Sequence, residues 1–458
     1  MVEIVILGSR AKIRGELPQN VLEELDEVCA YQPEDYEYSK RYIEGSWNGW
    51  IHLFNKLQRS FPVGLISSIK FILELNSIFY TIKDIRQTST PAPLKSNIVL
   101  RDYQERIVQR ALEKKSGLIA LPTGAGKTQI AIELTARIGL PTIFIAPTEE
   151  IALQTIDRFK QALNQEIGLI GLGKFEPKRI TIATWQTLWN GIKKDNTQIL
   201  DSLKGFEVFF FDEGDILGAD EVYRVAQFCP ARFRYALSAT PFRVDRAELK
   251  MHGAVGDLIQ EVTASDLVKL GYLVKPFIKF VKSKSMFFPR WIKWQKIYSQ
   301  GVVHNKSRNE LLAGEIEKLR DMGRTVLVLV TEIAHGKLLE NLVSGSKFIH
   351  SSSKDRREVI ENFKENKVPI LISSPIVERG WDAPNITAMV LAGAGKSPVK
   401  AVQRIGRGLR PYNGKKDVRI IDVNDKGMRY LAEHSVERFK IYRSEPEFVI
   451  EGDVPDAI

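Results

Sequence analysis

The sequence predicts an α/β protein in which two lobes, each built on a parallel sheet, follow a small α+β N-terminal domain. A chain of 458 residues, with 44% hydrophobic and 27% charged residues, has globular composition and is long enough for two or three cores. From residue 96 onward, short apolar runs rich in β-branched residues alternate with helical patterns, which is typical of parallel sheets covered on both faces. Because this alternation occurs twice, we expect two such lobes in tandem.

The N-terminal domain is expected over residues 1–92, where the pattern is that of a mixed α+β unit. Its clearest apolar elements are residues 3–7 and 70–75. A Ser-Thr-Pro-Ala-Pro sequence follows at 89–93 and marks a boundary, because proline interrupts regular structure. The two lobes are then expected over residues 96–262 and 263–458.

Five apolar runs predict the strands of the first lobe, and five more predict those of the second. The first series comprises residues 117–122, 141–147, 180–184, 207–213 and 234–240. The second series comprises residues 324–330, 346–350, 368–374, 386–393 and 418–423. Their near-continuous apolar character indicates strands that are buried on both faces.

The net charge of +10 is concentrated in one part of the chain. Residues 1–95 have a net charge of −1 and residues 96–262 are neutral, whereas residues 263–458 hold 34 Lys and Arg against 23 Asp and Glu. The whole basic excess therefore lies in the last segment. Such an excess favours a polyanionic partner without saying which one.

Only two cysteines occur, Cys29 and Cys229, which excludes a disulfide framework and a four-cysteine zinc site within one chain. The histidines show no metal-ligand spacing. No stretch of 18 apolar residues occurs, and the N-terminus lacks a small-residue cleavage site. We therefore expect an intracellular, cytoplasmic location and no membrane segment.

The strongest local motif lies directly after an apolar run and directly before a helical pattern. It reads Leu121-Pro122-Thr123-Gly124-Ala125-Gly126-Lys127-Thr128. Its glycines let backbone N–H groups turn inward around phosphate oxygens, Lys127 can reach the β- and γ-phosphates, and the Thr128 hydroxyl can bind Mg²⁺. Leu121 replaces the usual first glycine, but the strand-loop-helix setting of a P-loop is intact.

Two consecutive acids, Asp212 and Glu213, end another buried run. In a protein with a P-loop, acids at this position bind the metal and orient the attacking water. Mg²⁺ needs hard oxygen ligands, so we expect Asp212 to hold it opposite Thr128. Glu213 is placed to orient and deprotonate the water that attacks the γ-phosphate.

Taken together, these motifs resemble those of the superfamily 2 helicases, whose two RecA-like lobes carry an ordered motif set. In the first lobe the matching residues are Arg101 to Gln104, residues 121–128, Pro147 and Thr148, Thr184 and Gln186, Asp212 to Asp215, and Ser238 with Thr240. In the second lobe they are residues 327–330, Ser374, Gly380 with Asp382, and Gln403 to Arg410, which include Arg407. The resemblance covers about residues 98–442.

The resemblance implies a role for each of these residues. Arg101 and Gln104 would recognise adenine, and Gly380 and Asp382 would approach the ribose or phosphates. Gln403, Arg407 and Arg410 would complete the catalytic set, with the two arginines as arginine fingers on the γ-phosphate. The residues implied to contact nucleic acid are Pro147, Thr148, Thr184, Gln186 and Ser374. Ser238 and Thr240 would couple hydrolysis to that contact.

A basic segment with interleaved aromatic residues opens the second lobe. Residues 263–300 carry eight Lys and Arg against one acid, Asp266, and include Trp291 and Trp294. Cations beside aromatic rings are what single-strand binding uses, so we expect both tryptophans to contact nucleic acid. The alternative is a strand entering a core, followed by a solvated amphipathic helix.

Other segments indicate which subfamilies of these helicases the chain resembles. They are similar to segments of repair and branch-migration helicases, restriction-enzyme motors and UvsW-like phage proteins. These segments are the motif at 403–410, which begins with a glutamine, residues 271–273 and 302–309, and residues 422–425 with His434 and Arg438. Residues 45–54 and 61–65 resemble the small domain that precedes the motor in UvsW-like helicases, where it helps grip duplex DNA. A tryptophan-rich packing core is the alternative for Trp47 and Trp50.

We therefore expect an ATP- and Mg²⁺-dependent DNA helicase or translocase that unwinds or branch-migrates forks and junctions during recombination, repair or replication. It would track one strand as a monomer, 3′ to 5′, and be encoded by a phage that acts in its host's cytoplasm. Recombination or replication proteins are expected partners. The alternatives are an RNA helicase, a restriction motor subunit, an ATP-hydrolysing sensor that never unwinds, and a small-molecule P-loop kinase, against which the second lobe argues.

Overall fold

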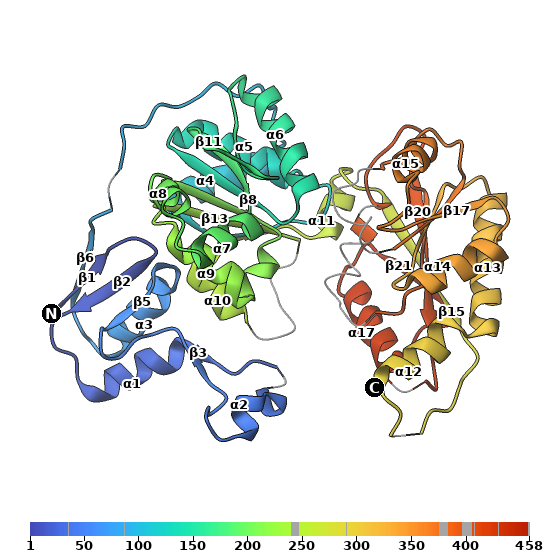
Figure 1. Ribbon diagram of the computed structural model, residues 1–458, viewed down its shortest axis with the longest axis horizontal. Helices are drawn as coiled ribbons and strands as arrows, with labels where there is room; N and C mark the ends of the chain where they lie inside the picture. Colours follow the sequence, from blue (N-terminus) through green and yellow to red (C-terminus); the bar gives the residue numbers. More distant parts are fainter. Residues whose placement is uncertain are drawn as a thin grey trace. The chain divides into compact units, whose positions relative to one another are not determined.

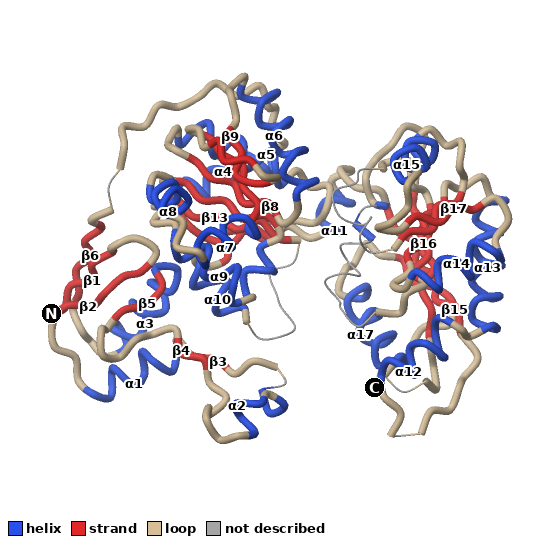
Figure 2. Tube along the Cα trace, in the orientation of Figure 1, coloured by secondary structure: helices blue, strands red, loops and turns tan. Residues whose placement is uncertain are grey.

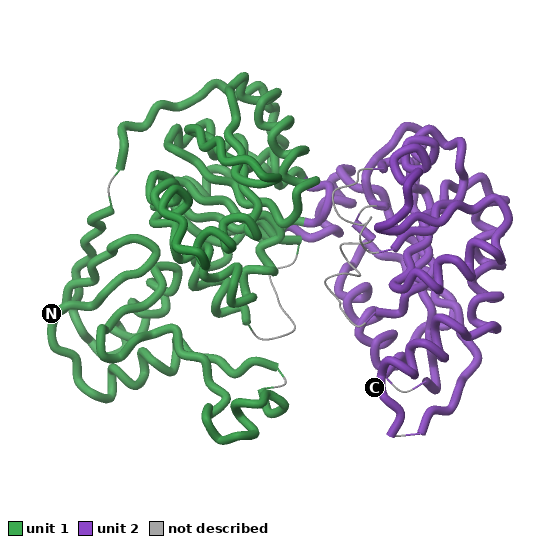
Figure 3. The backbone as a smooth tube through the Cα atoms, in the orientation of Figure 1, with its two compact units in different colours: residues 1–121, 126–261 green, residues 122–125, 262–458 purple. Residues whose placement is uncertain are grey.

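The computed structural model describes residues 1–34, 36–86, 88–239, 247–289, 291–374, 383–395, 405–406, 408–428 and 430–456. The chain forms two compact units (Figure 3). The first comprises residues 1–121 and 126–261, and the second comprises residues 122–125 and 262–458. The N-terminal domain thus shares a unit with the first large sheet.

The N-terminal domain is a four-stranded sheet with helices packed against it. The strand order is β5 (Ser60–Pro62), β2 (Arg10–Arg14), β1 (Val2–Ile6), β6 (Tyr80–Asp84), with β1 and β6 parallel and the other pairs antiparallel. Its helices and short strands are α1 (Gln19–Val28), α2 (Lys40–Ile43), α3 (Ile66–Leu75), β3 (Ala30–Tyr31) and β4 (Ile51–His52). Ile4 on β1 lies opposite Ile13 and Ile82, and with Leu25 and Ile69 it helps to close the core of the domain.

This domain is attached firmly to the first lobe. The backbone at Gly64 approaches helix α10 (Glu248–Val255) so closely that a Cβ there would lie 2.0 Å from the carbonyl oxygen of His252. Arg86 donates a hydrogen bond to the carbonyl of Ala231 at 3.0 Å. Any side chain at position 64 would therefore push the two parts of this unit apart.

The first lobe is an eight-stranded sheet, parallel except for its edge strand β10 (Figure 1). The strand order is β10 (Lys174–Glu176), β9 (Gly168–Gly171), β11 (Ile180–Thr184), β8 (Thr142–Ala146), β12 (Val208–Asp212), β13 (Phe233–Ser238), β7 (Ser116–Ala120), β14 (Leu258–Glu261). One group of contacting helices is α4 (Asp102–Lys114), α5 (Lys127–Ile138) and α6 (Glu149–Leu163); the other is α7 (Trp185–Lys193), α8 (Thr197–Lys204), α9 (Asp220–Phe228) and α10. The predicted strands are present, and β9, β10 and β14 are additional.

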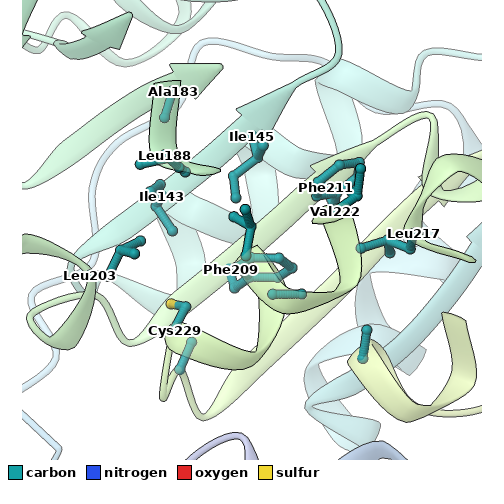
Figure 4. Close-up of a cluster of buried hydrophobic side chains, with 14 of the residues drawn as sticks. Ile143, Ile145, Ala183, Leu188, Leu203, Phe209, Phe211, Leu217, Val222 and Cys229 are labelled. Carbon is teal, nitrogen blue, oxygen red and sulfur yellow. The ribbon is translucent and has the colours of Figure 1, made fainter. Parts of the chain in front are cut away.

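The core of this lobe explains why its strands are almost wholly apolar. Phe209 and Phe211 on β12 are fully buried against Ile143 and Ile145 on β8 and against Val222 on α9 (Figure 4). Residues of a strand alternate between the two faces of a sheet, so a strand covered by helices on both sides needs apolar residues at successive positions.

The second lobe is a seven-stranded sheet whose strand pairs are all parallel. Its strands are drawn in red in Figure 2. The strand order is β17 (Ser346–Ile349), β18 (Ile370–Ser373), β16 (Val326–Leu329), β19 (Ala388–Leu391), β20 (Asp417–Asn424), β15 (Lys275–Lys282), β21 (Val449–Gly452). Its described helices are α11 (Ala264–Lys269), α12 (Trp294–Tyr298), the π-helix η4 (Ser299–Val303), α13 (Lys306–Asp321), α14 (Ile333–Leu342), α15 (Arg356–Lys364) and α17 (Leu431–Arg443). The predicted fold class, two parallel-sheet lobes after a small α+β domain, is confirmed.

Two buried ion pairs lie at the carboxyl end of β20. Arg308 on α13 donates to Asp425 at 2.9 Å, and both side chains are fully buried. Arg438 on α17 donates to both oxygens of Asp422, at 3.1 and 2.9 Å. Residues 302–309 and residues 422–425 with Arg438, which resemble branch-migration helicases, thus meet in one structural network.

His335 on α14 is buried beside this network, and we expect it to make the folding stability sensitive to acid. Its ring lies 2.9 Å from the amide oxygen of Asn309, and burial lowers its pKa from 6.5 to about 3, with the charge of Arg308 adding to the effect. The unfolded chain therefore binds a proton below pH 6.5 that the folded chain excludes, so folding stability falls as the pH drops through this window. At pH 5 we expect a loss on the order of 2 kcal/mol.

Thermal or denaturant unfolding between pH 5 and pH 7.5 tests this. His335→Gln keeps a donor for Asn309 and should flatten the pH dependence of stability, whereas His350→Gln, at a partly exposed position, should leave it unchanged. A wild-type pH dependence in His335→Gln would contradict the assignment.

No helix in the described parts of the chain combines the length and the apolar character that crossing a membrane would require.

Candidate nucleotide site and nucleic-acid interface

The loop between β7 and α5 has the backbone that phosphate binding requires. Gly124 and Gly126 have φ values of +89° and +84°, in the left-handed region that other residues rarely adopt. Helix α5 begins at Lys127, so its positive end faces the loop. Lys127 Nζ donates to the carbonyl of Leu121 at 3.0 Å, and the N–H of Leu121 donates to the carbonyl of Ser238 at 2.8 Å. The loop base is thus tied to the end of the neighbouring strand β13.

Gln104 supports this loop from helix α4. Its side chain is fully buried, its Oε1 accepts from the N–H of Arg101 at 2.9 Å, and its Nε2 donates to Gln129 at 3.2 Å. A Cβ on Gly126 would lie 2.3 Å from Gln104 Nε2. The structure therefore brings Gln104, one of the two residues matched to adenine recognition, against the phosphate loop.

The predicted acid pair ends β12, beside β13. The N–H of Glu213 donates to Asp212 Oδ1 at 2.9 Å. Burial raises the pKa of Asp212 from 3.8 to about 6, and the nearby cations Lys127 and Arg158 oppose this shift. A cation that binds beside this buried carboxylate would stabilise its charged form, which is the behaviour expected of a metal ligand.

Glu213 itself has a φ of +52°, which is uncommon outside glycine and costs energy. The next residue, Gly214, lies so near β13 that a Cβ there would be 2.9 Å from the Cβ of Ala236. This close approach accounts for glycine at position 214 and fixes the turn that carries Glu213.

Arg158 on α6 was not anticipated from the sequence. Its Nη1 lies 3.4 Å from the Thr128 hydroxyl, and its charge acts on Asp212. It thus places a cation beside both predicted metal ligands. No sequence signal marks it, because a single arginine in an amphipathic helix usually faces solvent.

The residues matched to nucleic-acid contacts in the first lobe lie at the ends of neighbouring strands. Thr148 follows β8 and caps α6, accepting a hydrogen bond from the N–H of Ile151 at 3.3 Å. Thr184 ends β11, which pairs with β8, and its side chain is buried. Gln186 Nε2 donates to the carbonyl of Pro147 at 3.1 Å. These residues are therefore brought together at one edge of the sheet.

The remaining predicted residues are only partly covered. Ser238 is buried at the end of β13, and Ser374 is buried after β18, its N–H donating to the carbonyl of Ile349 at 3.2 Å. Arg410 is half-buried in the second unit, to which the loop tip, Pro122, Thr123, Gly124 and Ala125, also belongs. Outside the described residues lie Thr240, Gly380, Asp382, Gln403 and Arg407.

Comparison with known protein families gives two matches. Residues 97–243 match the family described as type III restriction enzyme, res subunit, and residues 306–411 match the helicase conserved C-terminal domain. One match falls in each lobe, in the order expected. The chain belongs to the superfamily 2 helicases. It therefore uses ATP and binds nucleic acid.

The chain is also similar to individual known proteins. The DNA 3′-5′ translocase XPB2 of Sulfurisphaera tokodaii is 25% identical, over 74% of this chain and 84% of the relative. The ATP-dependent DNA helicase uvsW of Enterobacteria phage T4 is 23% identical, over 94% of this chain and 95% of the relative. The solved structure of S. cerevisiae Dbp5 bound to RNA and ADP BeF3 has a TM-score of 0.54 at 19% identity, over 79% of this chain and 90% of that one. The last likeness concerns the fold alone.

The two tryptophans of the basic segment have different environments in the helicase. The Trp294 ring lies 5.0 Å from that of His434 and 5.6 Å from that of Tyr298, in a small apolar cluster of the second lobe. Trp291 is 84% exposed. The core alternative is therefore favoured for Trp294, whereas Trp291 remains available to a partner.

The tryptophans of the N-terminal domain are not part of its core. Trp50 is 42% exposed, and Trp47 donates from its ring N–H to the carbonyl of Trp50 at 2.7 Å. The guanidinium of Arg41 lies 5.9 Å from the Trp47 ring centre. This favours a surface role over the packing alternative.

Proposed function

We propose that this helicase is an ATP-dependent DNA translocase that unwinds or branch-migrates forks and junctions. The observation that carries the proposal is the likeness to the DNA helicase uvsW, which extends over nearly the whole of both chains and so includes the N-terminal domain. The XPB2 relative, which is also named for DNA, supports DNA over RNA.

ATP would be held by the loop between β7 and α5. The backbone N–H groups of residues 122–127 would surround the phosphates, Lys127 would move from the carbonyl of Leu121 to the β- and γ-phosphates, and Arg101 with Gln104 would face the adenine. The hydroxyl of Thr128 and the carboxylate of Asp212 are hard oxygen donors that fit Mg²⁺. When bound, Mg²⁺ neutralises charge on the phosphate oxygens.

Glu213 would accept the proton of the water that attacks the γ-phosphate. Its position after β12 is fixed by the N–H contact to Asp212 and by the close packing of Gly214. Arg407 and Arg410, assisted by Gln403, would bring positive charge to the γ-phosphate during hydrolysis, and Gly380 and Asp382 would approach the ribose or phosphates. Ser238 and Thr240 would transmit the state of this site to the DNA.

The DNA strand would lie along the edge where β8 and β11 end. Pro147, Thr148, Thr184 and Gln186 would contact its phosphates from the first lobe, and Ser374 would do so from the second. Such contacts carry no base information and suit a motor that moves along any sequence. We further propose that the helicase acts as a monomer, 3′ to 5′, alongside recombination or replication proteins in the cytoplasm of a phage-infected bacterium.

A substrate panel tests the proposal. Unwinding and ATP hydrolysis are measured with a fork, a four-way junction, a blunt duplex, single-stranded DNA, and RNA forms of the same sequences. We expect the fork and the junction to be processed faster than the plain duplex, and DNA to stimulate hydrolysis more than RNA. Equal or greater activity on RNA would contradict the DNA assignment, and indifference to branching would contradict the junction assignment.

A further inference from the structure

Two large aromatic side chains of the second lobe are exposed to solvent. Phe287 is 90% exposed and Trp291 is 84% exposed, which makes them the two most exposed aromatic side chains among the described residues. Both lie between β15 and α12, in residues 283–289 and 291–293, which are called the aromatic loop below. An exposed tryptophan and phenylalanine so close in sequence indicate a binding surface.

The aromatic loop is anchored on both sides of its exposed rings. Phe288 is buried in the cluster around Trp294, with Met286 and Ile292 packed against the same cluster. Ser283 donates to the buried carboxylate of Asp425 at 2.9 Å, and Ser285 donates to the carbonyl of Lys426 at 2.8 Å. Because Phe288 and Ile292, the residues that follow them in sequence, pack into the cluster, Phe287 and Trp291 are presented from an anchored backbone.

The sequence on both sides of the aromatic loop is basic, which favours an anionic partner, and the acids Asp453 and Asp456 act on Lys282 directly before the loop. The sequence contains ten Lys and Arg and no Asp or Glu from residue 267 to residue 309. Lys279 is paired with Glu315 at 2.9 Å, but Lys282, Lys284, Lys293 and Lys296 are exposed. Such a surface suits a polyanion that also offers flat apolar faces.

We propose that the aromatic loop binds single-stranded DNA, with Phe287 and Trp291 stacking on unpaired bases while the exposed lysines contact the adjacent phosphates. This rests on the proposed function, which supplies DNA as the substrate, and it adds the place where the separated strand is held. Only unpaired bases expose a face to a side chain, so the loop discriminates between single strands and duplex without reading sequence.

Fluorescence anisotropy with a labelled oligo(dT) and with a blunt duplex tests the proposal. Phe287→Ala and Trp291→Ala should each weaken single-strand binding by about 5- to 150-fold, the effect of losing one stacked base, and should leave duplex binding unchanged. Phe79→Ala is the matched control, because Phe79 is 80% exposed in the N-terminal domain. Wild-type affinity for oligo(dT) in both loop variants would overturn the proposal.

The salt dependence of binding tests the charges separately. Lys284→Glu and Lys293→Glu should each flatten the slope of log affinity against log salt for oligo(dT) by about 0.7 or more, whereas Lys347→Glu, on β17 at the surface, should not. An unchanged slope in the loop variants would place the strand elsewhere.

A third arm uses vesicles rich in phosphatidylserine, since basic aromatic loops also bind anionic membranes. Binding of the wild-type chain to the vesicles, lost in Trp291→Ala while oligo(dT) affinity is unchanged, would assign the loop to a membrane instead. The proposed function is judged by stimulation of wild-type ATP hydrolysis by DNA, and the loop by direct binding to oligo(dT), so either can fail without the other.

Discussion

Replacing Glu213 with glutamine should lower kcat for ATP hydrolysis by about 10²- to 10⁴-fold, because the amide cannot accept the proton of the attacking water. The affinity for ATP should change little, since the phosphate contacts come from the loop before α5 and from Lys127. The amide is close in size to the carboxylate and leaves the backbone contact from the Glu213 N–H to Asp212 intact.

Steady-state hydrolysis combined with binding of a fluorescent ATP analogue measures this. Glu221→Gln, at an exposed acid on α9, is the matched control and should hydrolyse ATP at the wild-type rate. Lys127→Ala should lose both binding and turnover, which separates the two roles. Full turnover in Glu213→Gln would remove Glu213 from the catalytic assignment.

The second large effect concerns stability. Asp425→Leu should cost about 3–5 kcal/mol, because it leaves the guanidinium of Arg308 buried without its carboxylate. Restoring neutrality with Arg308→Met in the same chain should recover part of this loss, since no uncompensated charge then remains. Asp456→Asn, which removes an exposed pair with Lys426, should not change stability measurably.

Denaturant unfolding followed by circular dichroism measures these differences. A double variant as unstable as Asp425→Leu alone would show that packing, and not the buried charge, dominates at this position. The network also receives Ser283 from the aromatic loop, so Asp425→Leu should loosen that loop as well.

Much of the fold could be predicted because buried parallel strands are recognisable by themselves. Residues 208–211 and 326–329 are strings of apolar residues that few other structures accommodate. Strand β15 was harder to predict, because Lys275 and Lys279 interrupt its apolar pattern. The structure supplies the reason: these lysines form ion pairs with Glu447 and Glu315, which are distant in sequence. Part of the basic segment is therefore a strand of the sheet, and two of its lysines are neutralised by ion pairs.

The candidate site also has parts that could be predicted from the local sequence and parts that depend on tertiary contacts. The phosphate loop and the acid pair are local in sequence, and glycines and carboxylates placed directly after buried strands are typical of a nucleotide site. Arg158 reaches the site only because α6 packs beside α5, a tertiary contact that no pattern in its own helix records. The different environments of Trp291 and Trp294 likewise depend on the cluster around Tyr298 and His434, which forms only when α12 meets α17.

ATP hydrolysis by the purified chain, measured with and without a DNA fork while strand separation is followed in the same reaction, tests the central claim most directly. The proposed function predicts hydrolysis that is stimulated by the fork, strand separation that requires ATP, and loss of both in Glu213→Gln. Hydrolysis that is indifferent to DNA, or that is stimulated by the fork without any strand separation or branch movement, would contradict it.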